Sequence, residues 1–109
     1  MPYDVFLTND AEKDLDDIYE YIYVNDSPTK AEYVLGEIEK ASHTLKGLPE
    51  KGTYPNELIK LGIKQYREIF FKPYRIIYQI RKKTVYIMLI TDGRRDMQTL
   101  LQRRLLGAL

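Results

Sequence analysis

Three strand-like runs in the second half of the chain are separated by single residues, and this spacing constrains the fold more than any other feature. The runs span residues 64–72, 74–82 and 84–91, with Pro73 and Lys83 between them. Links this short leave no room for a crossover, so consecutive strands must be antiparallel neighbours. The sequence therefore predicts a three-stranded antiparallel meander.

The middle run alternates in the period-two pattern of a half-buried strand. One set comprises Tyr74, Ile76, Tyr78 and Ile80, and the other comprises Arg75, Ile77, Gln79 and Arg81. We expect the first set to pack into the core and the opposite face to carry Arg75 and Arg81. Arg67, on the preceding strand, joins them only if the register brings it to the same face, which the pattern leaves open.

The first 25 residues indicate a short strand followed by an amphipathic helix. Residues 3–7 are rich in aromatic and β-branched side chains, as strands are. Asn9 stands three residues before Glu12 in a capping-box arrangement, and apolar residues then recur at helical spacing. The sequence predicts a helix that is capped by Asn9 and has an acidic outer face.

A second helix is predicted directly after the first. Ser27 can cap its N-terminus, and the fixed backbone angle of Pro28 suits the first helical position. Its apolar stripe continues to about Lys46, and Gly47 stands where a left-handed residue commonly ends a helix. Two helices joined by so short a turn pack as a hairpin.

The remaining segments complete a single-domain prediction for residues 1–109. Glycine and proline in residues 47–55 indicate a long loop rather than a domain linker, because neither half has enough apolar residues to fold alone. After a turn at Asp92 and Gly93, residues 96–106 have a helical apolar stripe. The predicted fold class is α+β with the order β-α-α-β-β-β-α. The helix hairpin packs on one face of a small antiparallel sheet, and the other face carries a basic cleft.

Acidic and basic residues are divided between the two halves of the chain. Residues 1–50 hold 12 Asp/Glu and 4 Lys/Arg, whereas residues 51–109 hold 4 and 13. The halves therefore carry net charges of −8 and +9, although the whole chain carries only +1. A basic half that also carries tyrosines predicts a surface for a polyanion, because clustered cations attract phosphates.

Composition excludes several kinds of site. The chain has no cysteine, and His43 is its one histidine, so no thiolate metal site, cysteine nucleophile or histidine cluster can form. We expect no metal and no other cofactor. The N-terminus lacks the basic start and apolar run of a secretory signal, and no apolar run approaches the roughly 18 residues of a membrane span. The chain is predicted to be cytoplasmic, without membrane association.

Two sequence strings carry a family resemblance. Residues 66–80 read YREIFFKPYRIIYQI, and residues 92–96 read DGRRD before the last predicted helix. Together with the opening strand and the hairpin, in this order, they resemble the RelE/ParE family of bacterial toxins, which includes plasmid stabilisation proteins. The resemblance spans nearly the whole chain and implies the toxin of a type II toxin–antitoxin pair, with a cognate antitoxin as partner. RelE-like members cleave mRNA on the ribosome, and ParE-like members poison DNA gyrase.

The resemblance also implies the site residues of a metal-independent endoribonuclease. Arg75 and Arg95 match the arginines with which RelE-like nucleases hold the phosphate under attack, and Lys64 and Arg67 lie near their upstream lysines. Fixed guanidinium groups suit this chemistry, since attack by a ribose 2′-hydroxyl builds negative charge on the phosphate oxygens. Leu101 stands where these nucleases place a tyrosine, so Lys64 or a tyrosine would have to exchange the proton.

Four further cations are assigned to binding the RNA backbone: Lys60, Lys72, Arg81 and Arg94. The first prediction is a ribosome-dependent mRNA endoribonuclease, with the ribosome and mRNA as partners. The alternative is a non-catalytic DNA gyrase inhibitor that acts through the hairpin and the C-terminal segment. A third possibility is an inactive relative that binds only its antitoxin.

A simpler interpretation of the same charges stays open. The cations of the later strands could form a solvated sheet face and a protected edge, where lysine discourages aggregation. Arg94 and Arg95 could pair with Asp92 or Asp96, as charged residues in turns often do at little gain in stability.

Overall fold

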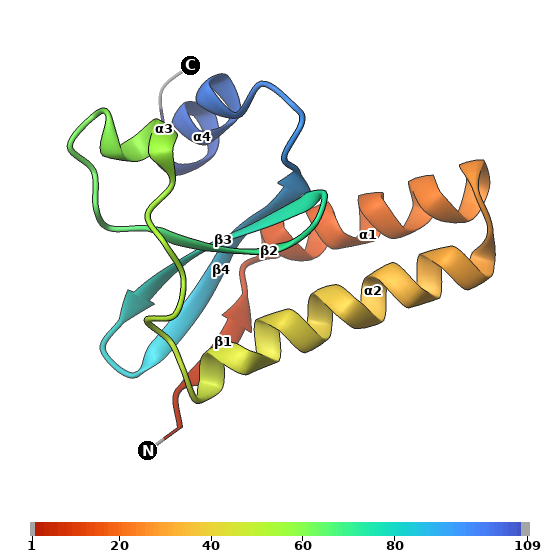
Figure 1. Ribbon diagram of the computed structural model, residues 1–109, viewed down its shortest axis with the longest axis horizontal. Coiled ribbons are helices and arrows are strands. Elements are labelled where there is room, and N and C mark those ends of the chain that lie inside the picture. Colours follow the sequence, from red (N-terminus) through yellow and green to blue (C-terminus); the bar gives the residue numbers. More distant parts are fainter. Residues whose placement is uncertain (1, 108–109) are drawn as a thin grey trace.

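The computed structural model describes residues 2–107 and contains the predicted elements in the predicted order (Figure 1). The elements are β1 (Asp4–Leu7), α1 (Asn9–Asn25), α2 (Pro28–His43), α3 (Asn56–Ile59), β2 (Arg67–Phe71), β3 (Tyr74–Arg81), β4 (Thr84–Asp92) and α4 (Met97–Leu105). The predicted α+β class, with a helix hairpin packed on a small sheet, is confirmed. The one-turn helix α3 was not predicted.

The sheet has the strand order β1-β4-β3-β2. Strands β2, β3 and β4 form the predicted antiparallel meander. Strand β1 pairs parallel with β4, so the sheet is mixed and not wholly antiparallel. The long connection from β1 to β4 permits a parallel neighbour, whereas the two short links of the meander do not.

Hydroxyl side chains cap both helices of the hairpin. Thr8 Oγ1 accepts a hydrogen bond from the Ala11 N–H at 3.2 Å, so the cap predicted at Asn9 is wrong by one residue. Ser27 caps α2 and Pro28 follows it at the start of the helix, as predicted.

The end of α2 differs from the prediction. A 3-10 turn at Thr44–Lys46 follows the helix, and Gly47 has a φ of −96°, in the right-handed region. The predicted left-handed conformation of this glycine is therefore wrong. The tighter turn satisfies the terminal carbonyl groups of the helix without such a residue.

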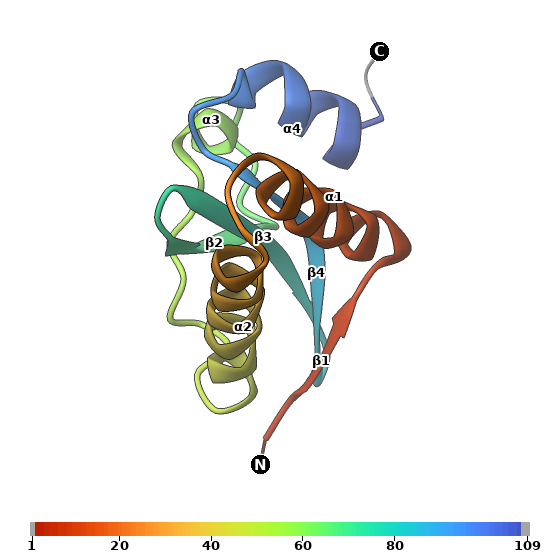
Figure 2. The same cartoon turned by 90° about the vertical axis from the view of Figure 1, so that its right-hand side faces the viewer.

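Apolar side chains form a cluster on each face of the sheet. The larger cluster lies between the hairpin and the sheet and includes Ile38 and Ile76. In the smaller one, on the opposite face, Leu58 of α3 and Leu101 of α4 pack with Ile77. Figures 1 and 2 both place α3 next to α4 at one end of the sheet. Two helices therefore cover part of the face that was predicted to carry the basic cleft.

A β-bulge at Met88 redirects the second part of β4. Tyr78 pairs with Ile87 and Ile77 pairs with Leu89, so that Met88 has no partner of its own. The extra residue shifts the alternation of side chains. Ile87 consequently joins the larger apolar cluster, and Leu89 joins the smaller one.

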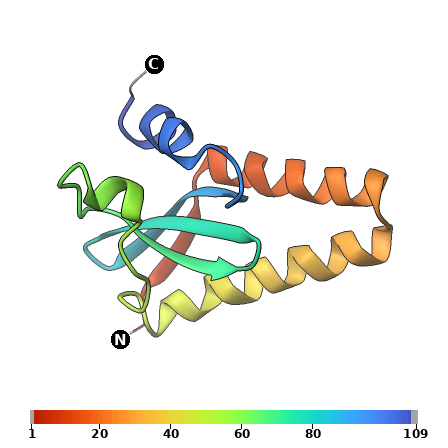
Figure 3. The same cartoon turned by 45° about the horizontal axis from the view of Figure 1, so that its top comes forward.

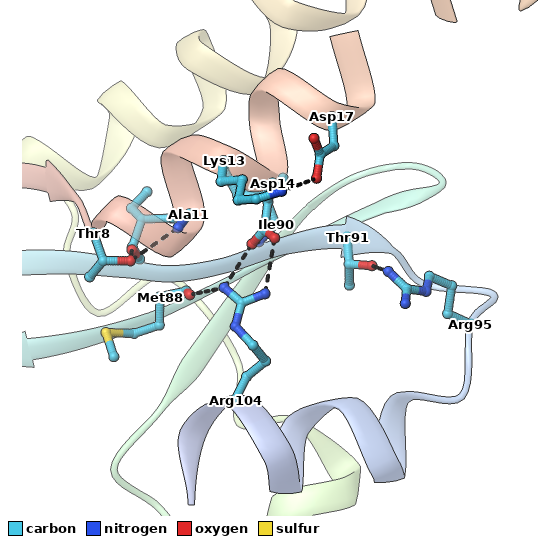
Figure 4. Close-up of polar contacts among 11 residues, drawn as sticks. Thr8, Ala11, Lys13, Asp14, Asp17, Met88, Ile90, Thr91, Arg95 and Arg104 are labelled. Carbon is cyan, nitrogen blue, oxygen red and sulfur yellow. Dashed lines mark hydrogen bonds and ion pairs between the residues drawn. The ribbon is translucent and has the colours of Figure 1, made fainter. Parts of the chain in front are cut away.

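Polar contacts around the bulge join the first and last helices to β4 (Figure 4). Arg104 donates to both carboxylate oxygens of Asp14, at 2.9 and 3.0 Å, and to the Met88 carbonyl at 3.0 Å. Asp14 also accepts a hydrogen bond from the Ile90 N–H at 3.0 Å. These contacts fix where α4 lies on the sheet.

The hairpin extends well past the strands, and its far end has no other element beside it (Figures 1 and 3). Among the helices of residues 2–107, none has the length and apolar character that crossing a bilayer requires.

Candidate functional site

Arg75 lies on the face of the sheet that carries the smaller apolar cluster. Its two terminal nitrogens donate to Glu57 Oε2 and Oε1 at 2.9 and 2.8 Å, and its Nε donates to Glu68 Oε1 at 2.7 Å. The Arg75 side chain is 11% exposed and the Glu68 side chain 7% exposed. Two carboxylates therefore occupy the guanidinium group and shield it from solvent.

The three charges change one another's protonation through pairing and burial. Hydrogen bonds from Arg75 hold the pKa of Glu57 below its usual value. For Glu68 the larger influence is burial, which raises its pKa even though the same guanidinium group lies beside it. With two carboxylates on one buried cation, little positive potential is left to attract a phosphate.

The loop between α2 and β2 sets the position of Glu57. The buried Tyr78 hydroxyl donates to the Pro49 carbonyl at 2.6 Å and accepts from the Gly52 N–H at 3.0 Å. Further along, Leu58 is buried in the smaller apolar cluster and anchors α3. Because Glu57 precedes Leu58 in this short helix, the anchored loop holds the Glu57 carboxylate next to Arg75.

Gly93 allows the aliphatic part of Arg75 to lie against the turn between β4 and α4. A Cβ atom at Gly93 would lie 2.7 Å from Arg75 Cδ and 2.9 Å from Arg75 Cγ. Beyond its contact with the turn, the Arg75 side chain extends toward Glu68 of β2 and Glu57 of α3.

Arg95, the second arginine matched to the phosphate site, lies exposed in the turn after β4. It donates to Thr91 Oγ1 at 3.4 Å (Figure 4). It also lines an open groove of about 530 Å³ between α1 and this turn, to which α1 contributes Asp14 and Asp17. Thr91 is the cross-strand neighbour of Arg75. Both arginines thus belong to the same end of the sheet, but only Arg95 is open to solvent.

Arg67 and Lys64 line a different hollow, of about 390 Å³, near the start of β2. The register pairs Arg67 with Tyr78, which places Arg67 on the hairpin face of the sheet, opposite to Arg75. Its guanidinium group donates to two loop carbonyls at 2.9 and 3.2 Å and lies 4.7 Å from the centre of the Tyr54 ring. Arg67 and Lys64 therefore do not join Arg75 and Arg95, which belong to the other end of the sheet. The catalytic roles of all four stay predictions.

The four cations assigned to an RNA backbone are exposed and dispersed. Lys72 lies in the β2–β3 turn, Arg81 lies at the other end of β3, and Lys60 follows α3. Arg94 donates to Asp92 Oδ1 at 2.9 Å, and this contact lowers the pKa of Asp92. The simpler interpretation of the charges predicted this pairing within the turn. Within residues 2–107, no cluster of acidic and histidine side chains is arranged to hold a metal ion.

The sequence match to a known family covers most of the elements that build these sites. Residues 5–97 match the family described as the ParE toxin of the type II toxin–antitoxin system, parDE. The chain belongs to this family. The predicted resemblance to RelE/ParE toxins is therefore confirmed, and this ParE-family chain is the toxin component of a type II system. None of the curated proteins matches it in sequence.

Solved structures share the fold of this ParE-family chain at low identity. A structure of the chromosomal ParDE system from P. aeruginosa superposes with a TM-score of 0.70 and is 22% identical, covering 83% of this chain and 95% of that one. The RelBE2 toxin–antitoxin complex from Mycobacterium tuberculosis superposes with a TM-score of 0.61 and is 20% identical, covering 84% of this chain and 92% of that one. A double arginine mutant of the E. coli toxin RelE in the free state superposes with a TM-score of 0.64 and is 13% identical, with both chains fully covered.

Sequence reasoning missed the two acids that hold Arg75. Glu68 carried a partial signal, because alternation along the strand puts it on the face opposite to Arg67, but the observed register is needed to show that this is the face of Arg75. Glu57 carried none, since its position depends on how an irregular loop folds back over the sheet.

Proposed function

We propose that this ParE-family toxin inhibits DNA gyrase by binding it and does not cleave RNA. The observation that carries the proposal is the guanidinium group of Arg75, which Glu57 and Glu68 hold at 2.7–2.9 Å. A phosphate clamp needs a guanidinium group that is free to reach phosphate oxygens. In this toxin a phosphate would first have to displace carboxylates of the protein.

The energy of that displacement argues against catalysis. Removing one partner of a buried ion pair typically costs about 3–5 kcal/mol. Glu57 is 24% exposed, so the lower end of this range applies. Because about 1.4 kcal/mol corresponds to a factor of ten in rate, exposing Arg75 would cost a nuclease about two orders of magnitude. Leu101, which is fully buried, offers no group that could exchange a proton.

The far end of the hairpin is the proposed gyrase contact. Tyr21 and Val24 of α1 are 69% and 72% exposed. Tyr33 of α2 is 55% exposed, but its ring packs edge-on against Phe71 of β2, so it lies beside the sheet and not at the free end. Tyrosine side chains are frequent among the residues that dominate binding energy at protein interfaces. This end projects away from the sheet (Figure 3), so a large partner can reach it without meeting α3 or α4.

A cognate antitoxin is the other proposed partner, because the family is defined by toxin–antitoxin pairs. We expect a disordered or helical antitoxin segment that lies along the hairpin and the sheet and orders on binding. A cytoplasmic location is part of the same proposal, since bacterial gyrase acts on chromosomal and plasmid DNA there.

Two assays on the purified toxin test the proposal. DNA supercoiling by gyrase is measured with increasing toxin, and cleavage of ribosome-bound mRNA is mapped in parallel. We expect loss of supercoiling and an unchanged mRNA pattern. The double variant Tyr21→Ser with Val24→Ser should weaken gyrase inhibition about tenfold or more, as replacement of central interface residues does. Its matched control is Phe70→Ser, at an exposed aromatic position on the sheet.

Cleavage of ribosome-bound mRNA together with full gyrase activity would overturn the proposal and restore the nuclease prediction. Inhibition of gyrase that the hairpin variants leave unchanged would keep the target and refute the contact surface. Activity in neither assay would favour a relative that only binds its antitoxin.

A further inference from the structure

Phe6, Tyr86 and Arg81 form a lateral stack on the sheet face opposite the hairpin. Phe6 of β1 pairs in register with Tyr86 of β4, and the two rings stack with centroids 6.2 Å apart and planes 22° apart. Arg81, at the end of β3, places its Cζ 5.8 Å from the centre of the Tyr86 ring on the same face. Three neighbouring strands therefore each contribute one flat, polarisable group.

This stack lies outside the region that α3 and α4 cover. Val5 and Leu7, on either side of Phe6 in the chain, pack against the larger apolar cluster, so Phe6 faces the other way. Phe6 is 57% exposed, and none of the three stacked side chains belongs to the cluster beneath α3 and α4. Phe6 is also on the edge strand, which leaves its ring at the open end of the stack.

Cations border the stack. Arg81 and Lys82 are consecutive and exposed at the β3–β4 turn. Lys83, which follows them, instead places its Nζ 5.1 Å from the centre of the Tyr3 ring, which packs against the larger apolar cluster on the hairpin face. Lys82 has a φ of 55°, in the left-handed region where glycine or asparagine is favoured in two-residue hairpin turns. The geometry of the turn therefore does not by itself favour a lysine at this position. Asp4, two residues before Phe6 on the same strand, is the acidic residue at the edge of this surface.

We propose that this stack and the β3–β4 turn bind single-stranded nucleic acid. An unpaired base extends the stack at the Phe6 ring, and the adjoining phosphates lie against the cations of the turn. Aromatic side chains on strands, flanked by Arg and Lys, bind unpaired bases largely without regard to sequence, because every base has a flat π-face. A duplex hides those faces within its own stack. This surface is distinct from the hairpin end proposed to contact gyrase, and the inference does not depend on that function.

Fluorescence anisotropy tests the site with labelled oligonucleotides of about 12 nucleotides, a length that spans a typical single-strand site. The probes are oligo-dT, oligo-U and a DNA duplex of equal length, each titrated with the purified toxin at several salt concentrations. We expect binding of the single strands that weakens with salt, and weaker binding of the duplex. A preference for one of the single strands identifies DNA or RNA as the natural source.

Three variants separate stacking, charge and fold. Phe6→Leu keeps the apolar volume but removes the ring, and we expect the Kd for single strands to rise about tenfold. Lys82→Asn suits the turn better and removes one charge, so we expect unchanged or higher thermal stability together with a salt slope smaller by about 1. Phe70→Leu is the control, because Phe70 is 48% exposed on the same sheet but lies on the other edge strand.

Several results would overturn the inference. One is a wild-type toxin that binds no single strand at low salt. Another is equal binding of duplex and single strand with no effect of Phe6→Leu, which would indicate non-specific attraction of charge. A third is loss of antitoxin binding, with nucleic-acid binding intact, in the Phe6→Leu variant, since the stack would then be a protein interface.

Discussion

Arg104 and Asp14, 90 residues apart in the chain, form an ion pair with two hydrogen bonds of 2.9 and 3.0 Å. Both side chains are less than one-fifth exposed, and Arg104 also satisfies the Met88 carbonyl at the bulge. The pair joins α1 to α4, although the two helices pack on opposite faces of the sheet (Figure 4). The position of the last helix therefore depends on a contact at the opposite end of the sequence.

Replacing Asp14 by Asn should lower the free energy of unfolding by about 1–3 kcal/mol, because it removes a partly buried, charged hydrogen-bond acceptor. Urea unfolding measures the change. The control is Asp17→Asn, since Asp17 contacts Lys13 at 3.4 Å with both side chains mostly exposed, and a loss below about 1 kcal/mol is expected there. Equal losses in the two variants would show that the Asp14–Arg104 pair contributes no more to stability than the exposed Asp17–Lys13 pair.

The two acids that share Arg75 should give opposite pH dependences. The pKa of Glu57 is lowered from 4.5 in the folded protein, so its ionised form stabilises the fold above pH 4.5, and this effect is lost as the pH falls through the lowered pKa. We expect Glu57→Gln to destabilise the toxin by about 1–3 kcal/mol at pH 7. The difference from wild type should shrink below pH 4.5.

Glu68 provides the comparison, because burial raises its pKa above 4.5. Its contribution is fully present below pH 4.5 and is lost as the pH rises through the raised pKa. The stability of the wild type relative to Glu68→Gln should therefore fall with rising pH, opposite to Glu57→Gln. Urea unfolding at intervals from pH 3 to pH 7 measures both. Parallel curves for the two variants would contradict the assigned pKa directions.

Local signals were sufficient for most of the fold. The short links around Pro73 and Lys83 predict the antiparallel meander because the chain has no length for anything else. Ser27 and Pro28 predict the start of α2 because capping depends on adjacent residues only. These features were confirmed, since each is decided within a few residues of the chain.

Features set by distant contacts were not predictable in the same way. The bulge at Met88 changes which face Leu89 joins, and its freed carbonyl finds Arg104 of a helix that follows later in the chain. The family resemblance singled out Arg75, but it carried no information on Glu57, whose position depends on a loop held by Tyr78. A motif arginine can therefore be present in the sequence while its guanidinium group is already occupied.

Gly52 should tolerate no side chain, because a Cβ atom there would lie 2.6 Å from the Tyr78 hydroxyl and 2.7 Å from the Glu68 carbonyl. Gly52→Ala should destabilise the toxin by about 1–3 kcal/mol through overpacking. The control is Gly36→Ala within α2, where the added methyl group meets no atom within 4 Å. That variant should gain about 0.5–1 kcal/mol from better helix propensity. Thermal unfolding measures both, and a neutral Gly52→Ala would show that the loop is loosely held.

A neutralised version of the Arg75 cluster separates a structural role from a catalytic one. The triple variant Arg75→Met, Glu57→Gln and Glu68→Gln removes all three charges and leaves none unpaired. Replacing a buried ion network with uncharged side chains of similar volume is often neutral or stabilising. Methionine is also unbranched and can follow the path of the arginine Cγ and Cδ atoms beside Gly93. We expect a folded toxin that inhibits DNA supercoiling about as well as the wild type.

The single variant Arg75→Met is its matched control, because it leaves Glu57 and Glu68 without their cation. It should lose about 3–5 kcal/mol of stability, less where water reaches Glu57, and its activity should fall only as far as its folded fraction falls. Circular dichroism gives that fraction for each variant. If the triple variant is folded but inactive, Arg75 itself contacts the target, and its hydrogen bonds with Glu57 and Glu68 must break when the toxin binds. Retained activity in the folded triple variant would instead assign this motif arginine to holding α3 on the sheet.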